Sequence, residues 1–259
     1  MKTCPLCLNR VEKLHKRSHL LPEWMYKDVY DERHKLVNVD FKNEYVKKEQ
    51  KGIHDEIICP TCESESQQYD RYASLILTKR SPTSIEYSSI TRIQNERVHN
   101  GELCKYSHWK NINFHKFQKF VYICILRTHF SNSKNGKPLL IEKHFQKIRN
   151  LYLSNQSNDD KSYPIITLNY LNNNGFEDIV LLPFANKKYG HFTIELAGCG
   201  YNFEVYVSSH RNPKFVNSLR LMENGSMYII HDYMENTGTF RNTKTGVVNI
   251  ADKFPNFKI

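Results

Sequence analysis

The 259-residue chain has no long hydrophobic segment. Its longest apolar run, Phe120–Leu126, is far shorter than the roughly 20 residues that a transmembrane helix needs. No charged segment followed by an apolar one precedes Cys4, so we expect no secretory signal peptide. Internal repeats and low-complexity tracts are also missing, apart from three asparagines at 172–174. These absences argue against a membrane protein and a repeat protein, and they favour a cytoplasmic one.

The cysteines do not indicate a disulfide framework. Seven are present, and four of them form two Cys-x-x-Cys pairs at 4–7 and 59–62. Such pairs are typical of metal sites in a reducing compartment, and two pairs supply the four soft thiolates of a closed tetrahedral zinc site. We therefore expect Cys4, Cys7, Cys59 and Cys62 to bind one structural Zn²⁺. The alternative is that the two pairs form small buried cysteine clusters.

The composition allows a substantial core, because 39% of the residues are hydrophobic and 12% aromatic. The net charge of +10 is uneven: residues 1–100 hold 17 basic and 15 acidic side chains, and residues 101–259 hold 20 and 12. A basic surplus of this kind suits an anionic partner such as DNA or RNA, whose phosphates exchange counterions for lysine and arginine. Many basic proteins bind no nucleic acid, so charge alone leaves both possibilities open.

The order of elements predicts an α+β protein in three parts. Residues 1–80 form a zinc module, 81–112 a connector with a strand near 84–90, and 113–259 a basic α+β domain. In the module we expect a short helix near 24–30, a loop or exposed helix over 42–51, and a helix from Glu63 with apolar residues at helical spacing. A zinc knuckle that leads straight into a helix is the layout of a treble-clef finger. Two helices, 114–130 and 138–153, then precede a mainly antiparallel sheet with strands at 163–171, 178–184, 191–196, 202–207 and 226–233.

Three segments of the module resemble the HNH-type nucleases, whose ββα-metal site lies inside a treble clef. These segments are Cys4-Pro-Leu-Cys7, Ser18-His19-Leu20-Leu21-Pro22 and Ile57-Ile58-Cys59-Pro-Thr-Cys62-Glu63. The resemblance covers about the first 75 residues. It implies that His19 is the general base that takes a proton from the water attacking a phosphodiester.

The resemblance also implies a second, catalytic metal ion. Glu63 stands where the family places a metal-binding histidine, and a carboxylate there suits Mg²⁺ or Mn²⁺. His54 stands near the position of the central asparagine and is a further catalytic candidate. Ser18 replaces the usual acidic residue before the histidine, so Asp55, or Asp70 two helical turns along, would have to complete the cation site. A structural role for each of these residues is the alternative.

The first functional expectation is a metal-dependent endonuclease that cuts nucleic acid, DNA rather than RNA, in a bacterial defence or conflict system. The second is a catalytically degenerate zinc finger that binds nucleic acid or a protein partner of such a system as an adaptor. A third is an enzyme whose site lies wholly within residues 101–259. Candidate nucleic-acid contacts are basic residues near the histidine turn and beside the tyrosine-rich strands: Lys16, Arg17, Lys187, Lys188 and Arg211.

Overall fold

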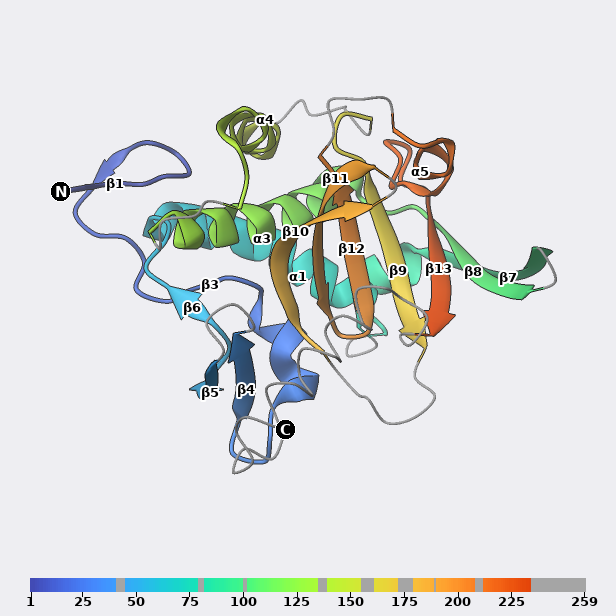
Figure 1. Ribbon diagram of the computed structural model, residues 1–259, viewed down its shortest axis with the longest axis horizontal. Coiled ribbons are helices and arrows are strands. Elements are labelled where there is room, and N and C mark those ends of the chain that lie inside the picture. Colours follow the sequence, from blue (N-terminus) through green and yellow to red (C-terminus); the bar gives the residue numbers. More distant parts are fainter. Residues whose placement is uncertain are drawn as a thin grey trace.

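The computed structural model describes residues 1–40, 45–78, 82–99, 102–134, 139–154, 161–171, 179–188, 190–207 and 212–233. Within these ranges the chain is an α+β protein with a large, mainly antiparallel sheet, as the sequence predicts (Figure 1). None of the helices found there is both long enough and apolar enough to pass through a membrane.

The described part of residues 1–77 contains three pairs of antiparallel strands, a 3₁₀ segment and one long helix. The expected short helix is the 3₁₀ segment η1, and the expected helix after the second cysteine pair is α1. Strands β1 and β2 pair with each other, as do β3 and β6, and β4 and β5. The elements are β1 (Lys2–Thr3), β2 (Arg10–Val11), β3 (Ser18–His19), η1 (Glu23–Val29), β4 (Lys35–Asp40), β5 (Tyr45–Gln50), β6 (His54–Asp55) and α1 (Pro60–Leu77).

The lysine-rich stretch 42–51 differs from expectation. Its described part, Tyr45–Gln50, is the strand β5, which pairs along its whole length with β4. Residues 41–44 lie outside the described residues. The high charge density correctly indicated exposure, but pairing with the preceding strand β4, not local charge, decided the backbone conformation.

The segment 82–110 does more than connect. It forms α2 (Ile85–Ser89) and the hairpin of β7 (Thr91–His99) and β8 (Glu102–Lys110), which makes one edge of the main sheet. The strand expected near 84–90 is wrong, because the Ser84 hydroxyl accepts a hydrogen bond from the Tyr87 amide and thereby caps a short helix instead.

The main sheet has seven strands in the order β10-β11-β12-β9-β13-β8-β7. All its neighbours are antiparallel except β13 and β9, which run parallel. The five strands expected in the second half are all present, although β10 begins later than predicted. Their bounds are β9 (Ile165–Leu171), β10 (Leu181–Lys188), β11 (His191–Gly198), β12 (Tyr201–Tyr206) and β13 (Met227–Tyr233).

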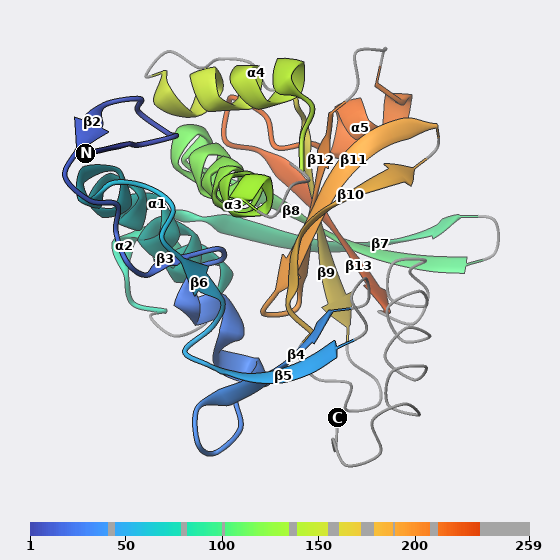
Figure 2. The ribbon, with the colours of Figure 1, turned by 60° about the vertical axis from the view of Figure 1, so that its left-hand side comes forward.

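The helix α3 (Phe114–Lys134) lies between α1 and the sheet, and α4 (Glu142–Leu153) packs on α3 (Figure 2). Every side chain from Phe117 to Ser131 is buried, as expected for a helix that is apolar on more than one face. The same hydrophobic cluster includes Cys4, α3 and the sheet residue Phe203, so the cysteine-bearing module and the sheet share one core. The short helix α5 (Lys214–Leu219) contributes Val216 to a separate small cluster with Ile166 and Tyr206.

Candidate metal centre and histidine pair

The four paired cysteines meet at one point. Their sulfurs all lie within 4.8 Å of one another, with 4.0 Å between Cys4 and Cys62 and 3.9 Å between Cys7 and Cys59. Four sulfurs about 2.3 Å from a tetrahedral ion would be separated by about 3.8 Å. The predicted convergence of the cysteines is therefore confirmed, and the cluster could hold one metal ion such as zinc.

Backbone amides donate hydrogen bonds to two sulfurs of this cluster. The amide of Cys59 donates to the Cys4 sulfur at 3.3 Å, and the amide of Cys62 donates to the Cys59 sulfur at 3.5 Å as the N-cap bond of α1. The hydrogen bond between the sulfurs of Cys62 and Cys4 lowers the pKa of Cys4 to about 4, against the opposing effect of burial, and the same contact raises the pKa of Cys62. Burial raises the pKa of Cys7. A metal ligand must be deprotonated, so binding of an ion by all four sulfurs would release protons from the cluster.

The strand pair that follows the first knuckle carries both candidate histidines. Strands β3 and β6 are antiparallel, and the register places Ser18 opposite Asp55 and His19 opposite His54. The amide of Leu20 donates to the carbonyl of Ile53 and extends this pairing by one bond. Directly opposite residues share a face of the hairpin, so His19 and His54 lie side by side, with ring centres 5.8 Å apart.

The surroundings of His19 favour the neutral imidazole. Its Nε2 lies 2.9 Å from the carbonyl oxygen of Lys51, and since a carbonyl can only accept, Nε2 carries the proton. Partial burial lowers the pKa of His19 below its ordinary value. The Lys51 carbonyl and the Glu23 carboxylate oppose this shift, whereas His54 and Arg127 add to it. A neutral ring with one fixed N–H leaves Nδ1 as the basic nitrogen.

The turn Lys51–Gly52 supplies the contacts that orient both rings. His54 is exposed, and its Nδ1 lies 3.3 Å from the carbonyl oxygen of Gly52. Both turn residues have positive φ, at 63° and 72°, a region that glycine adopts at little cost. A Cβ on Gly52 would also lie 2.9 Å from ring carbons of the buried Tyr26. The turn is therefore fixed by a close approach to the core.

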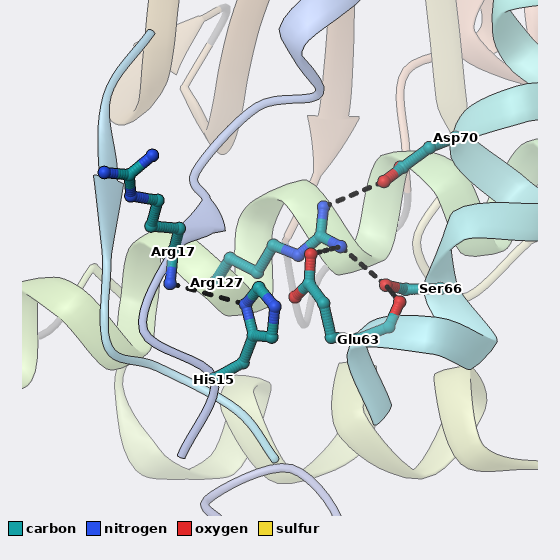
Figure 3. A network of polar contacts seen from close by, with 6 residues as sticks. All are labelled: His15, Arg17, Glu63, Ser66, Asp70 and Arg127. Atoms are coloured by element: carbon teal, nitrogen blue, oxygen red, sulfur yellow. Dashed lines mark hydrogen bonds and ion pairs between the residues drawn. The ribbon is translucent and has the colours of Figure 1, made fainter. Parts of the chain in front are cut away.

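The carboxylates expected to bind a catalytic cation are bound to an arginine instead (Figure 3). The guanidinium of Arg127, on α3, lies 3.4 Å from Glu63 and 3.1 Å from Asp70 on α1, and it donates to the Ser66 hydroxyl at 2.5 Å. The side chain of Arg127 is only 1% exposed. Burial opposes its charge, but the carboxylates of Asp70 and Glu63 raise its pKa, so it stays protonated. Arg127 thus occupies the cationic position beside these two acids.

Asp55 accepts hydrogen bonds from the residue that follows β6 and from α3. One of its oxygens accepts the hydrogen bond of the neighbouring Glu56 amide at 2.6 Å, and the other accepts from the Ser131 hydroxyl at 3.2 Å. In the part of the chain that the structure describes, the four cysteines are the one group of three or more histidine, cysteine, aspartate or glutamate side chains arranged to hold a metal ion. Asp55 and Glu63 are not brought into such a group.

The predicted nucleic-acid contacts differ in their surroundings. Lys16 and Arg17 are exposed in the loop before β3, where the amide of Arg17 donates to Nδ1 of His15 at 3.4 Å. Lys187 is exposed on β10. Lys188 is bound by two carboxylates, since its ammonium lies 2.5 Å from Glu204 and 3.4 Å from Glu195. Arg211 lies outside the described residues.

Sequence reasoning missed the role of Arg127 as the link between α3 and α1. The signal was a lone arginine next to the longest apolar run, because a buried guanidinium must be compensated by acids. Glu63 and Asp70 stand seven residues apart, two turns along one face of α1, and are suitable partners.

Comparisons of the chain with protein-family models, with curated proteins and with solved structures give no match.

Proposed function

We propose that this protein is a nuclease that cleaves phosphodiester bonds of nucleic acid at the β3–β6 hairpin, with His19 as the general base. The observation that carries the proposal is the state of the His19 ring. Its Nε2 lies 2.9 Å from the Lys51 carbonyl oxygen, which places the N–H on that nitrogen, and partial burial lowers the pKa of the ring, so Nδ1 is the nitrogen that can accept a proton. A base prepared in this way requires no change of tautomer during the reaction.

The order of elements around the cysteines supports an HNH-like, treble-clef module with a structural zinc ion. A knuckle with Cys4 and Cys7 comes first, the paired strands β3 and β6 follow, and the second cysteine pair begins α1. A zinc ion bound by all four thiolates would tie the start of the chain to the start of α1. Its role would be to support the hairpin, since four thiolates leave no open coordination position for substrate.

A catalytic Mg²⁺ or Mn²⁺ has weaker support than the histidine. An ion at Glu63 would have to displace Arg127, and an ion at Asp55 would have to displace the Ser131 hydroxyl. One observation favours a cation. The Oε2 atom of Glu63 is buried and has no hydrogen-bond partner in the structure, so it is an oxygen that a metal ion could bind.

The second candidate function is a non-catalytic zinc-module adaptor that binds nucleic acid or a protein of a bacterial defence system. The specific observation in its favour is the neutralisation of the acidic pair by Arg127. If the two carboxylates serve only to anchor α3 on α1, the module keeps its fold but has no cation site. The exposed Lys16 and Arg17 would then contact phosphates without cleavage.

The deciding experiment is cleavage of plasmid DNA and of a long RNA, each with and without Mg²⁺ or Mn²⁺. We expect the wild-type protein to cut one of them and His19→Ala to be inactive. The matched control is His115→Ala, which removes an exposed histidine on α3 away from the hairpin. Retained binding in a mobility-shift assay without any cleavage would support the adaptor instead.

A further inference from the structure

The two imidazoles of the hairpin form a matched pair. His19 and His54 face each other across β3 and β6, and the rings are tilted by 50° with their centres 5.8 Å apart. At this separation one phosphate group could lie within hydrogen-bonding distance, about 2.6–3.2 Å, of both rings. His54 is exposed and His19 is half-buried, so substrate can reach the pair from solvent.

Each ring has one nitrogen engaged by the same turn. The carbonyls of Lys51 and Gly52 face Nε2 of His19 and Nδ1 of His54, respectively. Because carbonyl oxygens only accept, both of these nitrogens carry protons. The remaining nitrogens are Nδ1 of His19 and Nε2 of His54, and they perform any proton transfer.

The surrounding charge differs from that of a cation site. The carboxylates of Glu63 and Asp70 are compensated by Arg127, and Asp55 accepts bonds from Glu56 and Ser131. In the loop before β3, Lys16 and Arg17 are exposed basic side chains, which suit a polyanion. The Glu23 carboxylate also acts on His19, where it opposes the lowering of the pKa. The hairpin therefore offers two imidazoles, with basic side chains in the adjoining loop and one carboxylate near His19.

We infer that the His19–His54 pair cleaves RNA by metal-independent transphosphorylation, an inference that rests on the proposed nuclease function. Nδ1 of His19 accepts the proton of the ribose 2′-hydroxyl, and the 2′-oxygen attacks the adjacent phosphorus. Protonated His54 donates from Nε2 to the departing 5′-oxygen as the P–O5′ bond breaks. The products are a 2′,3′-cyclic phosphate and a 5′-hydroxyl end, and proton exchange with water restores the two rings.

RNA is the substrate because its nucleophile is part of the chain that is cut. A DNA phosphodiester has no 2′-hydroxyl, so its cleavage requires an external water and, in the usual case, a metal ion that activates it. In this reaction His19 acts as the base and His54 as the acid. A pair of this kind needs no group beyond the two side chains and the substrate.

The test uses three oligonucleotides of one sequence: RNA, DNA and RNA with a 2′-O-methyl group at every position. They are incubated with full-length protein in buffer freed of divalent ions by a chelating resin, and the zinc content of the same protein sample is measured. We expect cleavage of the unmodified RNA alone, with cyclic-phosphate ends identified by mass spectrometry. His19→Gln and His54→Gln, whose amides can still donate to the turn carbonyls, should each lower the rate at least about 100-fold.

The pH–rate profile separates catalysis from a structural role. The wild-type profile should be bell-shaped, His19→Gln should lose the acidic limb, and His54→Gln should lose the basic limb. His115→Ala should keep the full profile. Cutting of DNA or 2′-O-methyl RNA that requires Mg²⁺ or Mn²⁺ and survives His54→Gln would overturn this inference but leave His19 as the base of a nuclease. No cutting of any substrate under any condition would overturn both.

Discussion

Arg127 and Asp70 form an ion pair of 3.1 Å although they are 57 positions apart in the chain. The pair joins α3, the buried helix beside the sheet, to α1, the helix that begins at the second cysteine pair. Glu63 and Ser66 bind the same guanidinium from the previous turns of α1. The cysteine-bearing module is thus attached to the rest of the protein by a buried charged contact as well as by apolar packing.

Loss of the guanidinium should destabilise the protein strongly. Arg127→Met leaves the carboxylates of Glu63 and Asp70 buried and uncompensated, and breaking a buried pair from one side costs about 3–5 kcal/mol. Urea unfolding followed by circular dichroism measures this loss. The triple variant with Glu63→Gln and Asp70→Asn should recover a large part of it. A single variant as stable as the wild type would show that the network does not hold α1 to α3.

Metal binding should depend on the four paired cysteines and on no other. We expect one zinc ion per purified chain by elemental analysis, and Cys62→Ser should lose the ion and lower the melting temperature, because the cluster links the first knuckle to α1. Cys104→Ser is the control, since this cysteine is exposed on β8 and outside the cluster. Zinc content that is unchanged in Cys62→Ser would contradict the assignment.

The turn that orients the histidines should not tolerate a side chain at Gly52. Gly52→Ala combines a positive φ of 72° with a Cβ placed 2.9 Å from the ring of Tyr26. Gly190→Ala is a matched control, because it has a φ of 79° but nothing within 4 Å of its Cβ. The control should lose about 1–2 kcal/mol from the backbone conformation alone. We expect a larger loss of unfolding free energy for Gly52→Ala, together with loss of cleavage, and equal losses in both variants would rule out the contact with Tyr26.

The protonation of His19 should make stability depend on pH. Burial lowers its pKa below the ordinary value of 6.5, so the unfolded chain binds this proton more readily than the folded one. Above pH 6.5 the contribution of His19 to the unfolding free energy is therefore complete. The contribution falls as the pH drops below 6.5, and it stops falling once the pH is below the pKa of His19 in the folded state. Urea unfolding at pH 7.5 and 5.5 should show a smaller decrease for His19→Gln than for wild type. A ring-proton NMR titration of His19 with a midpoint above 6.5 would contradict the lowered pKa.

Local patterns predicted much of the architecture. Helical spacing of apolar residues located α1, and the apolar run with few polar interruptions located α3. Richness in valine, isoleucine, phenylalanine and tyrosine between asparagine and glycine turns located the strands after residue 160. The patterns failed at β5 and at β7–β8, whose charged and polar residues carry no strong local preference. These strands form because each is paired, β5 with β4 and β7 with β8, and the residue preferences of a single segment do not report such pairing.

The sequence by itself determined the cysteine cluster, since two pairs with a fixed spacing have the geometry that one tetrahedral ion requires. It also placed His19 between the two cysteine pairs. Only the tertiary structure decided what surrounds that histidine. A 34-residue segment separates His19 from its partner His54, and the buried cation beside Glu63 comes from α3, 64 positions further along the chain. Such neighbours arise when elements far apart in the chain pack into one core. A buried charge needs an opposite charge close to it in space, and the partner can come from any part of the chain.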